Sequence, residues 1–416
     1  MKAEYVAVID EITKGNTTLR TITEQSRVLE PARELRRRIP NFAKARSQAC
    51  SVFVSLQRGM RTTCRASHRA SVCMKPLELE SGPVSCDDDS AFRVILSHDP
   101  QEVSHLPSPW MIAEAEFRIL KGGLELQSNA TCMGTSLPVR SKGKKIVRVQ
   151  EPPKAPQAPS PAASMATHQP TLSEIRDLCE SIQSLRASKG GVCLGYLQSH
   201  ADDQRHGLYC PEEPLVGQNT ISSVSLRSLL EDSSSGSSST LSVSDSRKLA
   251  HSLALGVLRL YDSPWLDTQW KGDDIHLLGG KNRLLAEHPF VSTDLQRRAQ
   301  SAGPRICPAI RNQTLFALGI VLIELCLRTK FDSLLLPEDL GVDGAKHVAS
   351  DFLAAIRLID QVYDTAGKRY GDAVRRCILC EFDRHNTSLE DDLFRKAVYI
   401  NVVSVLEEDV EQFCGL

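Results

Sequence analysis

Hydrophobic and polar residues alternate along the segment 110–120, which reads WMIAEAEFRIL. One face of an extended chain would carry the apolar side chains and the other the charged ones, namely Met111, Ala113, Ala115, Phe117 and Ile119 against Glu114, Glu116 and Arg118. A period of two predicts a β-strand. Shorter apolar segments at 91–96 and 73–79 lie between acidic or Gly/Pro-containing breaks and predict two further strands.

Helical spacing dominates the rest of the chain. Residues 1–58 predict helices that are broken at Pro31 and Pro40. Thr171 and Glu174 have the spacing of a capping box, which predicts that a helix begins there. The apolar stripe of that helix would consist of Leu172, Ile175, Leu178, Ile182 and Leu185.

The C-terminal half is predicted to be mainly helical. A short helix at 226–230 and a longer one carrying Leu249, Leu253, Val257 and Leu260 precede the most apolar segment, 315–326. We expect that segment to be the central helix of the core, with the side chains of Leu318, Leu322 and Leu325 buried and Gly319 allowing a close helix contact. Three more helices are expected around 345–364, 368–380 and 391–413.

Two segments cannot form a core. Residues 138–170 are rich in proline and begin with a basic cluster, which could be a localisation signal or a phosphate contact, but a solvated linker is favoured. The Ser-rich segment 232–246 predicts an exposed loop, with Asp245 capping the next helix. Phosphate on Ser242 or Ser244 would stabilise that helix start, although an inert spacer is the favoured alternative.

These patterns predict an α+β, mainly helical chain with two lobes. The expected parts are an N-terminal helical segment (1–58), a small β-containing lobe (59–137), a Pro-rich basic linker (138–170) and a larger helical lobe (171–416). A length of 416 residues is sufficient for such an arrangement.

Charge and targeting signals narrow the class of protein. Lys and Arg number 50 against 51 acidic residues, so the composition favours neither nucleic acid nor an anionic membrane as a partner. No signal peptide is expected, and the segment 315–326 is too short to span a membrane and contains Glu324. Thirteen cysteines without framework spacing predict reduced thiols in an intracellular protein, most simply a cytoplasmic one.

Cysteine and histidine residues form only incomplete metal motifs. Cys377 and Cys380 have CxxC spacing, but no second pair accompanies them. Cys64, His68 and Cys73 form a similarly incomplete cluster. A tetrahedral zinc site needs four ligands, so we favour the interpretation that these thiols are small core hydrophobes.

The order of the C-terminal segments resembles the larger lobe of a protein kinase. The segment 226–230 resembles the short helix after the hinge, 245–260 the helix before the catalytic loop, 274–278 the Asn-Ile-Leu-Leu strand, and 315–326 the buried central helix. His288-Pro289 would lie at the end of the activation segment.

A closer resemblance is to a filamentous-fungal family with a domain of unknown function, found among prion-inhibition and HeLo-type helical proteins. It covers roughly residues 45–416 and rests mainly on the segment 263–275, with Pro264-Trp265-Leu266, Trp270 and Asp274-Ile275. The resemblance implies a degenerate kinase-like fold of undefined activity and without an established substrate.

The motifs that phosphoryl transfer needs are not found. The chain has no His-Arg-Asp, Asp-Phe-Gly, Gly-rich loop or strand lysine of the kinase type. Asp267, Asp273 and Asp274 are the only candidates for relocated roles, and a turn cap is favoured over magnesium binding for Asp273 and Asp274. His251, His276 and His347 have no Ser or Cys at a diagnostic spacing for a hydrolase triad. Trp265 and Trp270 are expected to pack in the core.

We therefore expect a non-catalytic, kinase-like interaction or regulatory protein in fungal signalling, with unidentified protein partners. Two alternatives stay open: an atypical ATP-dependent phosphotransferase using the relocated Asp residues, and an all-helical adaptor. No residue can be assigned a catalytic, cofactor-binding or metal-binding role from the sequence, and no cofactor is expected. Fold analogy by itself supports none of these functions.

Overall fold

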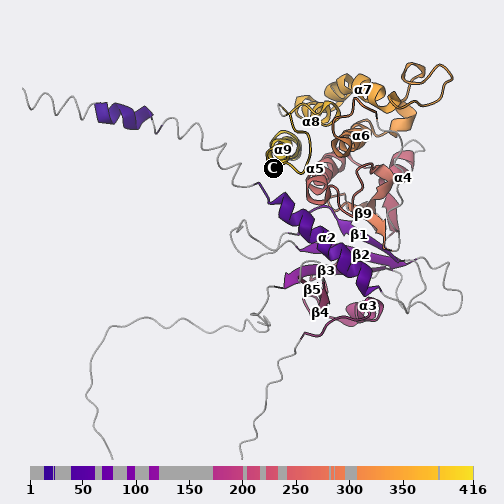
Figure 1. Cartoon of the computed structure of the whole chain (residues 1–416). Coiled ribbons are helices and arrows are strands. Elements are labelled where there is room, and N and C mark those ends of the chain that lie inside the picture. The colour runs from indigo at the N-terminus through magenta and orange to yellow at the C-terminus, as the bar shows by residue number, and fades with distance from the viewer. Residues whose placement is uncertain are drawn as a thin grey trace, which may run out of the picture. The chain divides into compact units, whose positions relative to one another are not determined.

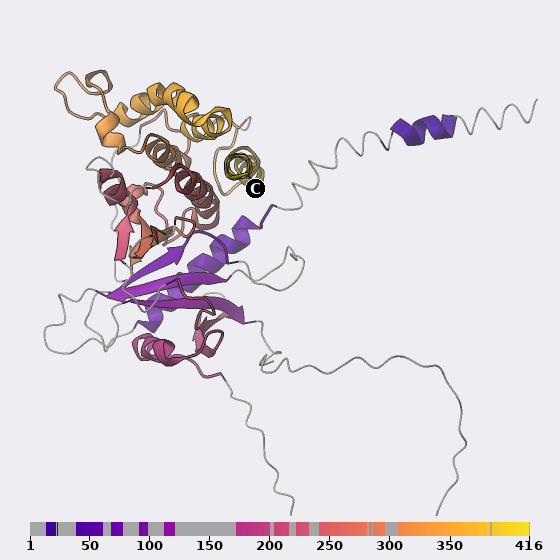
Figure 2. The same cartoon turned by 180° about the vertical axis from the view of Figure 1, so that it is seen from behind.

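The computed structural model describes residues 14–21, 23, 39–60, 68–77, 91–98, 112–120, 172–199, 204–215, 222–232, 241–280, 283–284, 286–295, 307–382 and 385–415. Those within 1–120 and 173–416 belong to one compact unit. In this unit a β-sheet packs against a group of helices, and one further helix crosses the sheet (Figures 1 and 2).

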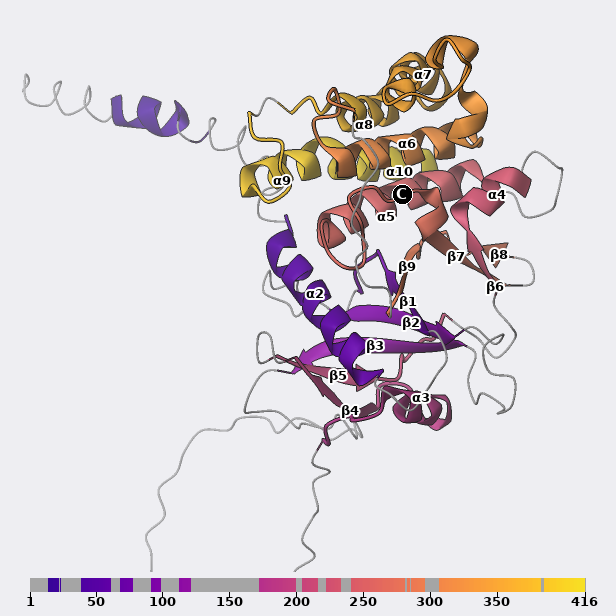
Figure 3. The same cartoon turned by 45° about the vertical axis from the view of Figure 1, so that its right-hand side comes forward.

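The sheet is antiparallel throughout and has nine strands within the described residues. The strands are β1 (His68–Cys73), β2 (Phe92–His98), β3 (Ile112–Leu120), β4 (Cys193–Gln198), β5 (Arg205–Tyr209), β6 (Ser222–Ser225), β7 (Ile275–Gly280), β8 (Arg283–Leu284) and β9 (Phe290–Asp294). Their order is β4-β5-β3-β2-β1-β9-β7-β6, and β8 pairs with β7 (Figure 3).

The pairing of β1 with β9 joins parts of the chain that are far apart in sequence. The register pairs Arg69 with Asp294 and Cys73 with Phe290. Between them, the hydroxyl groups of Ser71 and Ser292 lie 2.6 Å apart across the two strands. Strand β1 also pairs with β2 on its other edge, so the N-terminal strands and those from the C-terminal half form one continuous sheet.

Most helices gather on one side of the sheet (Figure 3). They are α4 (Leu226–Asp232), α5 (Val243–Leu260), α6 (Gln313–Leu327), α7 (Ser350–Ala366), α8 (Lys368–Leu379), α9 (Asp392–Val398) and α10 (Ser404–Cys414), with a π-helical turn at Tyr399–Val403. Short 3-10 turns are η3 (Gly272–Asp274), η4 (Phe331–Leu334) and η5 (Pro337–Asp339). Helices α2 (Phe42–Gly59) and α3 (Leu178–Ala187) pack on the sheet.

Helix α6 is the hydrophobic centre of the helical layer, as its sequence predicts. Leu318, Leu322 and Leu325 are at most 1% exposed. A Cβ atom on Gly319 would lie 2.5 Å from Cδ1 of Ile378, so glycine is what allows α8 to approach this closely. The expected burial and the close helix contact are both confirmed.

Several element boundaries differ from those expected. The strand predicted at 73–79 is wrong for residues 74–77, because strand β1 precedes them and ends at Cys73; residues 78–79 lie outside the described residues. Helix α3 begins at Leu178 rather than at Thr171, because the side chain of Asp177 accepts hydrogen bonds from the N–H groups of Cys179 and Glu180. Helix α5 is capped by Ser242, whose side chain accepts from the N–H of Asp245, and not by Asp245 itself.

Strand β3 has the predicted alternation, but its charged face is covered. Glu114 and Glu116 are 8% and 3% exposed. Arg93 on β2 contacts both carboxylates, with Nε 3.3 Å from Glu114 Oε1 and Nη2 3.0 Å from Glu116 Oε1. Buried charges need partners, and strand pairing with β2 supplies one.

The expected degenerate kinase-like fold with two lobes is wrong, although the α+β class is right. Strands from both predicted lobes share one sheet, and the described residues of 1–120 and 173–416 form one compact unit. The error arises because strand pairing between distant segments leaves no periodic signal in the sequence. The linker 138–170 and residues 233–240 of the Ser-rich segment lie outside the described residues, and the domain boundaries stay a prediction.

Replacing Leu322 by Ala tests the central role of α6. Leu322 is fully buried, so we expect the free energy of unfolding to fall by about 2–5 kcal/mol. The matched control is Leu353→Ala on α7, where the side chain is 45% exposed and the expected loss is under about 0.5 kcal/mol. Urea unfolding measures both, and equal losses would contradict the assignment of α6 to the core.

Candidate functional site

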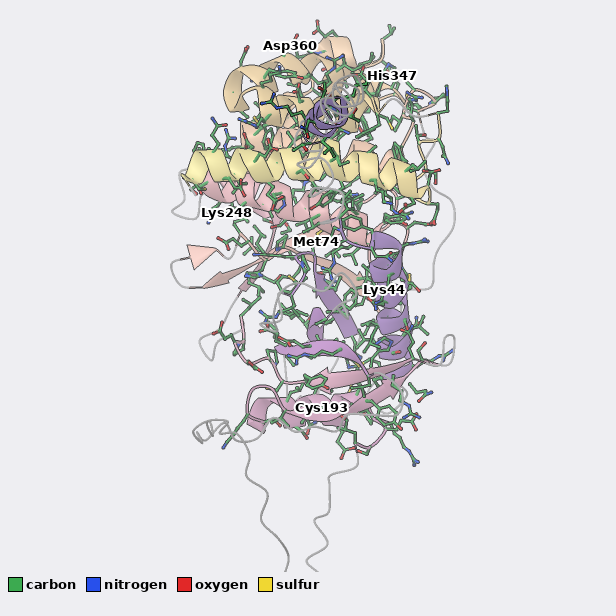
Figure 4. All side chains as sticks on the ribbon, turned by 90° about the vertical axis from the view of Figure 1, so that its left-hand side faces the viewer. Lys44, Met74, Cys193, Lys248, His347 and Asp360 are labelled. Atoms are coloured by element: carbon green, nitrogen blue, oxygen red, sulfur yellow. The ribbon has the colours of Figure 1, made fainter. Side chains whose placement is uncertain are left out.

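A cavity of about 350 Å³ lies among α4, η3, α6, η4 and the segment before α7. One wall is apolar and includes Phe316, Ile320 and Val321 of α6 together with Phe331 of η4. The lining also includes charged residues from α4 and η3 and from the segment that contains His347, which is labelled in Figure 4. Binding sites for small molecules and side chains commonly combine such an apolar wall with a few polar groups.

The charged side chains at the cavity form a chain of alternating ion pairs. Arg227 contacts Asp273 at 2.9 Å and Asp332 at 3.4 Å. Lys346 contacts Asp332 at 2.5 Å and Asp351 at 3.0 Å. Each pair is partly exposed and contributes little stability by itself. Together they connect α4, η3, η4 and the N-terminal turn of α7 around the cavity.

Glu324 is the one acidic residue of α6 and lies on the cavity wall. Burial raises the pKa of its carboxyl to about 7, and the nearby negative charge of Asp332 adds to the effect. Its Oε1 accepts a hydrogen bond of 2.9 Å from the N–H of Phe331, which opposes that shift. A Cβ atom on Gly272 would lie 3.2 Å from Oε2, so the glycine leaves room for the carboxyl group. The site therefore contains a group that changes charge near neutral pH.

Trp270 lines the cavity and is 2% exposed. Its indole Nε1 has no hydrogen-bond partner among the described residues. Trp265 is equally buried but does not line the cavity, and its Nε1 donates a 2.7 Å hydrogen bond to the carbonyl of Ala49 on α2. Core packing is thus confirmed for both tryptophans, and no sequence pattern indicates that Trp270 also borders a cavity.

The three aspartates proposed for relocated roles have different environments. Asp267 Oδ1 accepts from the N–H of Gln269 at 3.1 Å. Asp274 Oδ2 accepts from the N–H of Lys271 at 2.9 Å, which confirms the predicted turn cap. Asp273 makes no such cap but pairs with Arg227 at the cavity.

Within the described residues, the histidines and cysteines singled out in the sequence do not assemble into a triad or a zinc site, and Cys64 lies outside those residues. His347 Nδ1 lies 2.6 Å from Ser350 Oγ, but that hydroxyl is buried and also accepts from the N–H of His347. Cys377 and Cys380 are both buried, as expected for core thiols. Among the described residues no three His, Cys, Asp or Glu side chains form a group that could hold a metal ion.

Sequence analysis singled out Trp270, Asp273 and His347, but nothing in the sequence shows that they line one cavity. Glu324 was noted only because it interrupts an apolar helix, and that interruption is the one signal that could have pointed to it. Arg227, Asp332 and Lys346 are ordinary surface residues in the sequence, and only the fold brings them together. No helix in the described part of the chain is long and apolar enough to cross a membrane.

Comparison with known proteins gives one match. A family model for a domain of unknown function, DUF7580, matches residues 41–413. No curated protein and no solved structure matches the chain.

Replacing Glu324 by Gln should change how stability depends on pH. The raised pKa means that the proton on Glu324 stabilises the folded protein below the ordinary value of 4.5, and this contribution is lost as pH rises through about 7. Glutamine can still accept from Phe331 but does not ionise. From pH 5 to pH 8, the wild-type protein should therefore lose about 1–3 kcal/mol relative to Glu324→Gln.

Urea unfolding at several pH values measures this difference. Asp360→Asn, at an exposed position on α7 away from the cavity, is the matched control (Figure 4). Parallel pH profiles for the wild-type protein and Glu324→Gln would show that this carboxyl ionises like an exposed one.

Proposed function

We propose a non-catalytic role for this chain, which belongs to the family described as a domain of unknown function, DUF7580. In this proposal it is an interaction or regulatory protein that binds a partner through the cavity beside α6. The cavity itself is the observation that carries the proposal, because it combines an apolar wall with a charged border and a carboxyl group that titrates near neutral pH.

The charge of the cavity favours a particular kind of partner side chain. The formally charged residues that line it are three bases and four acids, namely Arg227, Lys271 and Lys346 against Asp273, Glu324, Asp332 and Asp351. One negative charge is therefore in excess when Glu324 is ionised. A lysine or arginine side chain combines an aliphatic stem with a terminal cation, so its stem would contact the apolar wall and its charge would lie near Glu324.

The surroundings of the candidate aspartates support a non-catalytic role over the phosphotransferase alternative. Phosphoryl transfer needs carboxylates that hold magnesium and a cation at the phosphates. Asp267 and Asp274 accept hydrogen bonds from backbone N–H groups, and Asp273 is paired with Arg227. On the resemblance to fungal proteins, we place this interaction in intracellular fungal signalling.

Ligand-observed NMR with blocked amino acids tests the recognition site. Nα-acetyl-lysinamide should bind, and the neutral isostere Nα-acetyl-norleucinamide should bind more weakly, because it lacks the cation. Ile320→Trp should abolish binding by filling the cavity, whereas Ile356→Trp, on α7 and outside the cavity lining, should not. Equal binding of both amides, or no effect of Ile320→Trp, would contradict this site.

A thermal-shift titration with ATP and magnesium tests the alternative. We expect no stabilisation and no release of phosphate. A nucleotide at a hundredfold excess over its dissociation constant would stabilise the folded protein by about 2.7 kcal/mol. Stabilisation of that size together with phosphate release would establish the phosphotransferase instead.

A further inference from the structure

Three side chains with soft or borderline donor atoms meet at a second place, among residues that do not line the cavity. Sγ of Cys179 lies 3.3 Å from Nε2 of His68 and 3.8 Å from Sδ of Met60. Met60 directly follows α2, His68 begins β1, and Cys179 is the second residue of α3. The sequence had grouped His68 with Cys73, but these two residues lie at opposite ends of β1.

Close packing of α2 on α3 brings the two sulfur atoms together. A Cβ atom on Gly59 would lie 3.0 Å from Cδ2 of Leu197 and 3.3 Å from Cβ of Leu178. Glycine at position 59 therefore helps the last turn of α2 to come this near to the start of α3. Met60 and Cys179 directly follow these two contacting residues, Gly59 and Leu178.

The histidine and the cysteine are held by their backbones. The N–H of Leu295 donates a 3.1 Å hydrogen bond to the carbonyl of His68, which also belongs to the register of β1 with β2. The N–H of Cys179 donates to Asp177 Oδ1 at 2.9 Å. His68 is 1% exposed, whereas Met60 and Cys179 are half-buried. An ion could thus reach the two sulfur atoms without the fold opening.

The distances suit a metal ion. Bonds of about 2.3 Å to sulfur and about 2.0 Å to nitrogen, at angles between tetrahedral and trigonal, separate the donor atoms by about 3.5–4.0 Å. The observed 3.3 Å and 3.8 Å are near this range, so small side-chain rotations suffice.

We propose that Met60, His68 and Cys179 bind a copper(I) ion. Thiolate and thioether ligands select copper(I), whereas zinc sites take Cys, His and carboxylate ligands and do not use methionine. On binding, the S–H bond of Cys179 breaks, the sulfur–copper bond forms, and the proton leaves to the solvent. The copper(I) ion replaces the thiol proton, and both carry a single positive charge. The net charge of the site is therefore unchanged, and no uncompensated charge is buried. No change of oxidation state is involved.

Competition for copper(I) with bicinchoninate tests the proposal on the reduced full-length chain. The chain has thirteen cysteines, and other thiols can also bind copper(I). The affinity is therefore measured for the first equivalent of copper(I), which binds most tightly. Cys179→Ser and Met60→Leu should each weaken it by about tenfold or more. Cys210→Ser is the matched control and should not, because the Cys210 thiol lies near the other end of α3, 3.7 Å from the carbonyls of both Leu185 and Ser188.

X-ray absorption at the copper edge gives an independent readout. The proposal requires one nitrogen and two sulfur neighbours, with one sulfur lost in Met60→Leu. Leucine has nearly the volume of methionine, so this variant should keep the fold and the melting temperature of the wild-type protein. An unchanged copper affinity in Met60→Leu, or a shell of sulfur atoms alone, would overturn the proposal and assign the copper to other thiols. Neither result bears on the cavity, whose test uses different ligands.

Discussion

Strand β1 holds this fold together because it pairs on both edges and also reaches the helices. Its neighbours are β2 and β9, and the pairing with β9 continues beyond the strand through a 2.9 Å hydrogen bond from the N–H of Met74 to the carbonyl of Pro289. Met74 then fits against α5 at Gly256, where a Cβ atom would lie 2.4 Å from that of Met74 (Figure 4). This contact ties the sheet to the helical layer.

A buried arginine reinforces the same junction. Arg259 of α5 is 4% exposed, donates a 3.1 Å hydrogen bond to the carbonyl of Met74 and lies over the ring of Phe92, 5.2 Å from its centroid. Burial lowers the pKa of its guanidinium to about 10. A buried cation is costly unless it is well bonded. The backbone carbonyl and the aromatic face therefore fix the position of β1 relative to α5, and they do so independently of the charges around the cavity.

Local patterns in the sequence predicted single elements well and their assembly poorly. The alternation in 112–120 identified β3, and the apolar run in α6 identified the centre of the helical layer, because both patterns repeat within a few residues. The two-lobed kinase-like arrangement failed because β1 and β9 pair across the chain without any local signal. The cavity around Glu324 and the contact between Met60 and Cys179 could not be predicted for the same reason. Each is formed by segments that meet only after folding.

The separation of β1 from β9 has a consequence for synthesis of the chain. Ser71 and Ser292, which face each other across the two strands, are 221 residues apart. A ribosome that adds 5–20 residues per second needs roughly 10–45 s to make that stretch. Throughout this interval, one edge of β1 has no strand to pair with, and an unpaired edge is a template for association with other chains. The nascent chain is therefore exposed to association at this edge until β9 emerges.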